Sequence, residues 1–85
     1  MKKLMYVIFD SKAGTYNTPI FFPTQAVAER SAIDALTDAD SEIARHPEDY
    51  TMFCIGEYDL DTALLKPYND FAHTLRFHEL LVPTE

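Results

Sequence analysis

Near the start of the chain stands Leu4-Met5-Tyr6-Val7-Ile8-Phe9, a run of residues that are all apolar. A strand with one face in water alternates apolar and polar residues, whereas a strand covered on both faces is apolar throughout. The run therefore predicts a strand at the centre of a sheet, with both of its faces covered.

A turn and a returning strand are predicted directly after this run. Residues 10–14 are typical of a turn, in which Gly14 can supply a positive φ. Residues 15–22 indicate the return strand, with an irregularity at Asn17-Thr18-Pro19 because proline donates no hydrogen bond to a sheet. The chain thus begins with an antiparallel hairpin.

A helix is predicted next, because Thr24 is a favourable N-cap and small apolar residues recur at helical spacing after it. Asp38, Asp40 or Ser41 could cap a second short turn. His46-Pro47 ends that turn, since the residue before a proline is disfavoured in the α region. The apolar stripe of the helix consists of Ala28, Ala32, Ala35, Leu36 and Ala39, flanked by Ile33.

A second hairpin comes after the helix. Residues 50–58 predict a strand in which Gly56 indicates a bulge, and residues 63–66 predict a short return strand that ends at Pro67. The expected faces of the longer strand are Tyr50, Met52, Cys54 and Tyr58 on one side, and Thr51, Phe53, Ile55 and Glu57 on the other. The predicted class is α+β, in the order hairpin, helix, hairpin, with a small antiparallel sheet packed by one main helix.

The C-terminal segment is open to two interpretations. A helix capped by Asn69 or Asp70 would place Phe71 and Leu75 on one face, while residues 75–78 also alternate as a strand would. We favour the helix. The 85 residues suit one domain, with an expected core over residues 3–68 and a tail over residues 69–85.

Composition favours an intracellular protein. The single cysteine allows no internal disulfide, which is typical of a reducing compartment. The apolar run behind Lys2 and Lys3 is too short for a signal peptide, and no stretch reaches membrane-spanning length. The net charge is −7, but in residues 1–23 three lysines oppose one aspartate, which gives that segment +2. Any contact with phosphates is therefore expected near the N-terminus.

No catalytic or metal site is predicted, and no cofactor. His78-Glu79 begins like a zinc-protease helix, but the second histidine is missing at Val82. Residues 38–42 alternate acids as a calcium loop does, yet they lack the glycine which that loop requires. Cys54 has no cationic neighbour in the sequence and is expected to be a small buried hydrophobe. We therefore expect a binding protein rather than an enzyme.

Two short sequence motifs in a fixed order resemble those of a known family. The first begins at Phe9-Asp10-Ser11-Lys12-Ala13-Gly14; the second joins His46-Pro47-Glu48-Asp49-Tyr50 to Ile55-Gly56-Glu57-Tyr58-Asp59. Their arrangement resembles the small nonstructural protein of gokushovirus-like microviruses, which are phages with single-stranded DNA genomes. The resemblance implies a protein of the host bacterial cytoplasm that is absent from the mature capsid. It also implies a role in the synthesis or packaging of single-stranded progeny DNA.

The resemblance makes single-stranded DNA a candidate partner, and the aromatic residues on the predicted strands could serve it, although in a chain of 85 residues they are first of all expected in the core. Unpaired bases stack on sheet-borne aromatic rings, and nearby lysines can hold the phosphates. The expected DNA-binding set consists of Lys2, Lys3, Lys12, Tyr6 and Tyr16. Because so few cations are available, this binding is expected to be weak and sensitive to salt.

The alternative is an acidic adaptor that docks a phage or host protein and forms a homo-oligomer without touching DNA. Its candidate contact loop consists of His46, Pro47, Glu48, Asp49 and Tyr50. A local role explains this loop better, because Pro47 fixes φ and Asp49 can cap backbone amides before the strand begins.

Overall fold

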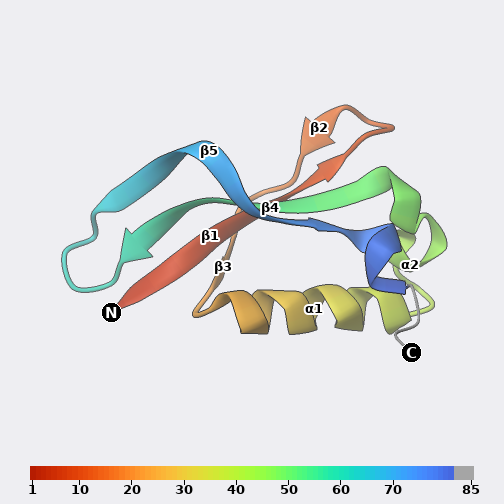
Figure 1. Ribbon diagram of the computed structural model, residues 1–85, viewed down its shortest axis with the longest axis horizontal. Helices are drawn as coiled ribbons and strands as arrows, with labels where there is room; N and C mark the ends of the chain where they lie inside the picture. The colour runs from red at the N-terminus through yellow and green to blue at the C-terminus, as the bar shows by residue number, and fades with distance from the viewer. Residues whose placement is uncertain (82–85) are drawn as a thin grey trace.

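The computed structural model describes residues 1–81, so predictions for residues 82–85 lie outside it. The strands form one antiparallel sheet in the order β2-β1-β4-β5, and β3 also pairs with β1 (Figure 1). This confirms the α+β class and the central position of the first strand. The elements are β1 (Lys2–Asp10), β2 (Thr15–Tyr16), β3 (Ile20–Phe22), α1 (Gln25–Thr37), α2 (Glu42–Arg45), η1 (Pro47–Asp49), β4 (Tyr50–Asp59), β5 (Leu65–Arg76) and η2 (Phe77–Leu81).

The main helix begins where the sequence predicts. The Thr24 side chain accepts a hydrogen bond from the backbone N–H of Val27 at 3.2 Å, which satisfies one of the free amides of the first turn. Ser41 caps α2 in the same way through the N–H of Ile43. As predicted, α2 ends at Arg45, just before His46-Pro47.

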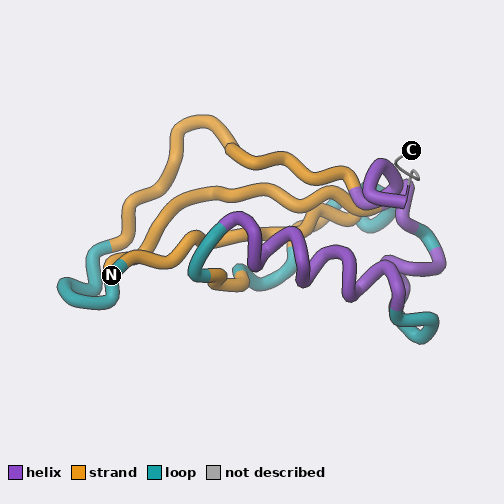
Figure 2. Tube along the Cα trace, turned by 60° about the horizontal axis from the view of Figure 1, so that its bottom comes forward, coloured by secondary structure: helices purple, strands orange, loops and turns teal. Residues whose placement is uncertain are grey.

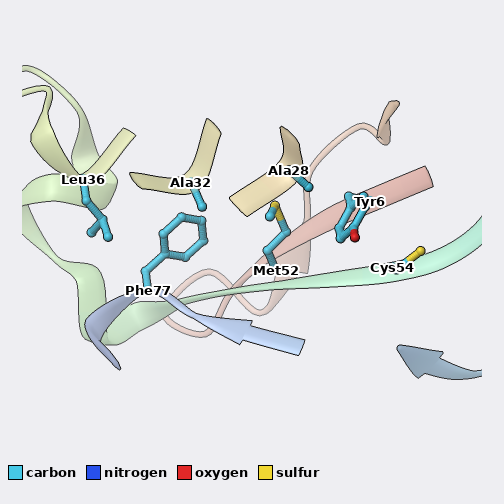
Figure 3. Packing of buried hydrophobic residues seen from close by; sticks show 7 residues of the cluster. All are labelled: Tyr6, Ala28, Ala32, Leu36, Met52, Cys54 and Phe77. Carbon is cyan, nitrogen blue, oxygen red and sulfur yellow. The ribbon is translucent and has the colours of Figure 1, made fainter. Parts of the chain in front are cut away.

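The core lies between α1 and one face of the sheet (Figures 1 and 2). Ala28 and Ala32 are almost completely buried, and their small side chains bring the helix close to the strands. Figure 3 shows Phe77 pointing from the far end of the chain toward Ala32 and Leu36. The buried cluster consists of Tyr6, Ala28, Ala32, Leu36, Met52, Cys54 and Phe77. Because Phe77 is fully buried, the core extends past the expected limit at residue 68.

A bulge in β4 changes the predicted faces of that strand. Met5 pairs with Gly56 and Tyr6 with Cys54, so Ile55 is an extra residue without a partner on β1. Since an extra residue reverses the alternation beyond it, Tyr58 faces away from the helix and Glu57 faces toward it. The prediction that Tyr58 shares a face with Cys54 was therefore wrong, although the bulge itself was expected at Gly56.

The segment after the second turn is a strand, not the favoured helix. β5 continues through Pro67 to Arg76 and ends in the short helical turn η2. Its backbone pairs with β4 at both ends and at Ala72, and the register shifts on either side of Cys54. Hydrogen bonds to β4 thus outweigh the helical spacing of Phe71 and Leu75.

Candidate nucleic-acid interface on the open face of the sheet

The sheet has one face without a helix, which we call the open face. Leu4, Tyr6 and Ile8 of β1 pack toward α1, so the alternate residues of the strand point the other way. Register extends this face to the neighbouring strands. The open face consists of Lys3, Met5, Val7, Phe9, Tyr16, Phe21, Thr51, Phe53, Ile55, Tyr58 and, from β5, Phe71.

Aromatic rings occupy much of the open face in two groups. Phe9 and Tyr16 have ring centroids 4.8 Å apart, and Phe71 lies 6.3 Å from Tyr16 and 5.3 Å from Phe53. At the opposite end, Phe21 lies 5.8 Å from Tyr58. Phe21, Tyr16 and Phe71 are 44%, 53% and 48% exposed, so these rings are open to a ligand. Exposed rings on a sheet are typical of surfaces on which unpaired bases stack.

Negative charge on the two central strands is confined to the opposite face. By register Asp10, Glu57 and Asp59 lie on the side that faces the helix. The open face of β1 and β4, both of which the structure describes completely, therefore carries no carboxylate. A polyanion would meet less repulsion here than the net charge of −7 suggests.

The three lysines of the expected DNA site are dispersed rather than gathered. Lys2 points toward the helix side and forms an ion pair with Glu57 at 3.6 Å. Lys3 lies on the open face directly opposite Tyr58. Lys12 lines an acidic hollow at the turn. Arg76 joins Lys3 on the open face by register, with a 3.6 Å ion pair to Glu79.

The two expected tyrosines separate as well. Tyr16 is on the open face, as stacking requires, but Tyr6 is fully buried beneath the helix and has no surface for a base. Its hydroxyl lies 3.1 Å from Nδ1 of His73. Burial, followed by the nearby Cys54 and Glu29, raises the pKa of Tyr6 to about 12. Tyr6 is therefore a core residue that fixes β5 to β1.

Four of the five residues of the expected contact loop, all except Pro47, line a hollow of about 600 Å³ together with Asp10 and Lys12, among others. The loop also has the local role foreseen from its sequence. The N–H of Asp49 donates to the carbonyl of His46, and the carbonyl of Asp49 accepts from the N–H of Ser11. One ligand atom each from His46, Glu48 and Asp49 lies within 4.8 Å of the others, so this turn could offer an imidazole and two carboxylates to a divalent cation.

Among the aromatic residues of the open face, Phe71 is the one that lies outside the strands predicted from the sequence. It lies in the segment favoured as a helix, where it would have packed with Leu75 instead of reaching the open face. The competing signal was Pro67, which separates the short predicted strand from the residues after it. A proline is tolerated in an edge strand, and β5 is such an edge.

The fold and its open face define a small α+β protein in which one helix covers one side of an antiparallel sheet. The chain belongs to the Phage ORF5 protein family, whose family model matches residues 3–80. It is 35% identical over 71 residues to Protein ORF5 of Chlamydia phage 1, and the match covers 79% of this chain and 74% of that protein.

These matches confirm the resemblance to gokushovirus-like microviruses, and the family model extends it through the C-terminal third. No solved structure matches the chain. Within residues 1–81, no helix has the length and apolarity needed to cross a membrane.

Proposed function

We propose that this phage protein is a binding protein without catalytic activity, and that it holds single-stranded DNA on the open face of its sheet. In this role it supports the synthesis or packaging of the phage genome in the host cytoplasm. The observation that carries the proposal is the open face itself, which displays aromatic rings while the carboxylates of its two central strands point the other way.

Stacking supplies most of the binding free energy in this proposal. Each stacked base contributes about 1–3 kcal/mol. Among residues 1–81, register puts two cations on the open face, Lys3 and Arg76, and these would meet the phosphates. For a single strand the slope of log K against log salt is about −0.7 for each neutralised phosphate, so two contacts give a slope of about −1.4. Binding is expected to be weak and only moderately sensitive to salt.

Two neighbouring lysines provide a matched test. A labelled oligothymidylate is titrated with the wild type, Lys3→Gln and Lys2→Gln at several salt concentrations, with fluorescence anisotropy as the readout. Lys3→Gln is expected to weaken binding and to bring the salt slope closer to zero by about 0.7. Lys2→Gln removes the same charge on the helix side and is expected to leave binding unchanged. Equal effects of the two substitutions would contradict contact through the open face.

A second candidate occupant of the open face is another copy of this chain. The helix covers one face of β1, and on the other face Met5 and Val7 are buried while the rings of Tyr16, Phe21 and Phe71 stay exposed and could pack against a second copy. Two acidic copies could meet on this side with least repulsion. If the titration shows no DNA binding even at low salt, and sedimentation shows a dimer that Phe21→Glu dissociates, the adaptor function replaces DNA binding.

A further inference from the structure

The edge strand β5 forms an arch over the open face. Gly56 of β4 pairs with Pro67 and Cys54 with Ala72, so residues 68–71 stand opposite the single residue Ile55. The surplus length bows away from β4, as the upper strand of Figure 2 shows. The arch, residues 67–73, thus contains a local excursion at residues 68–71, between the paired residues Pro67 and Ala72.

A strained residue closes the arch at its C-terminal end. His73 has a φ of 51°, a left-handed conformation that is unfavourable for any residue with a Cβ. The hydroxyl of buried Tyr6 lies 3.1 Å from its ring, and the preceding Ala72 packs against the core. Strain of this kind is kept where the surrounding structure holds it, and it is frequent at binding sites.

Beside the arch, the open face holds a shallow hollow of about 400 Å³ that is open to solvent. Val7 and Ile55 come from the two central strands, while Tyr16 and Phe71 contribute exposed rings. The volume is that of a small-molecule site, and the lining is almost wholly apolar. The lining residues are Val7, Tyr16, Ile55, Pro67, Tyr68 and Phe71.

We propose that this hollow beside the arch takes one unpaired nucleobase of the bound strand, held against the rings of Phe71 and Tyr16. The inference rests on the proposed DNA-binding function and assigns a specific subsite to it. The planes of these two rings are 88° apart, so a base that stacks on one ring meets the other at its edge. A flat ring suits the site, because stacking on an aromatic side chain does not need the hydrogen-bonding edge of the base. The subsite therefore gives affinity with little preference among sequences.

The test compares two rings of the same open face. Oligothymidylate binding is measured for the wild type, Phe71→Ala and Phe21→Ala; Phe21 is 44% exposed but lies outside the hollow. Loss of one stacked base corresponds to about a tenfold loss of affinity. We expect that loss for Phe71→Ala, with restored affinity in Phe71→Tyr, and a smaller loss for Phe21→Ala.

A second measurement uses a single nucleotide in place of an oligonucleotide. Thymidine monophosphate at millimolar concentration is added to isotope-labelled protein, and NMR shifts of Val7, Ile55 and Phe71 are expected to move together. Wild-type protein that binds no oligonucleotide would refute the proposed function itself. Oligonucleotide binding that is the same in Phe71→Ala as in the wild type would refute only the base subsite. Circular dichroism of both alanine variants establishes that they are folded.

Discussion

At the residue scale, burial alone separates core aromatics from those that can meet a ligand. Tyr6 and Tyr16 both belong to the DNA-binding set predicted from the sequence, and both lie on strands. Tyr6 is fully buried, whereas Tyr16 is 53% exposed. Sequence alternation cannot tell which face of a continuous apolar run a helix will cover, because both faces are apolar. Lys2 and Lys3 lie on opposite faces of the sheet because consecutive residues of a strand point to opposite sides.

The buried phenol of Tyr6 predicts a specific loss of stability in alkali. Its pKa is about 12 in the folded protein and near the ordinary value of 10 in the unfolded chain. The folded protein therefore keeps this proton to a higher pH than the unfolded chain does. The contribution of the Tyr6 phenol to the free energy of unfolding is fully present below pH 10 and is lost as pH rises toward 12.

Urea unfolding at pH 9 and pH 11 measures this effect in the wild type and Tyr6→Phe. The wild type is expected to lose more stability between the two pH values than the variant does. Tyr50 and Tyr68, whose pKa values burial also raises, contribute to both proteins and cancel in the comparison. Identical losses would mean that the Tyr6 hydroxyl is not buried as described.

At the element scale, the helix boundaries were predictable from the sequence, whereas the path of strand β5 was not. Thr24, Ser41 and Pro47 set the helix boundaries through local chemistry, and these were predictable from sequence. The length and path of β5 depend instead on distant pairing with β4, which no local pattern encodes. Phe71 reaches the candidate site only through that pairing, and for this reason the sequence did not reveal its role.

Gly56 shows how closely β4 and β5 approach. A Cβ at this position would stand 2.5 Å from the backbone oxygen of Lys66, so one of the strands would have to shift. Gly56→Ala is expected to lower the free energy of unfolding by about 1–3 kcal/mol through overpacking. Thermal unfolding followed by circular dichroism measures the loss.

Gly14→Ala is the comparison for this substitution. Gly14 has a positive φ of 71°, but nothing lies within 4 Å of an added Cβ. Gly14→Ala is expected to lower the free energy of unfolding by about 1 kcal/mol, because alanine disfavours a positive φ. A Gly56→Ala protein at least as stable as Gly14→Ala would contradict the close pairing of the two strands.

At the scale of the whole molecule, the chain is two-sided. The helix layer and the loops after it, residues 25–49, carry half of the 14 acids, while the open face of the two central strands is rich in aromatic residues and without carboxylates. Net charge alone disfavours DNA binding, because composition does not show how charge is arranged in space. Met5 and Val7 on the open side of β1 are themselves buried, so the exposed part of this face consists of the rings around them, those of Tyr16, Phe21 and Phe71.

The most direct measurement of DNA binding by the open face is an NMR titration of the isotope-labelled protein with oligothymidylate at low salt. We predict shift changes at open-face residues such as Phe9, Phe53 and Phe71, with α1 and the loop at residues 46–50 unaffected. Changes that cluster on α1 or on that loop, or none at saturating oligonucleotide, would contradict binding at this face.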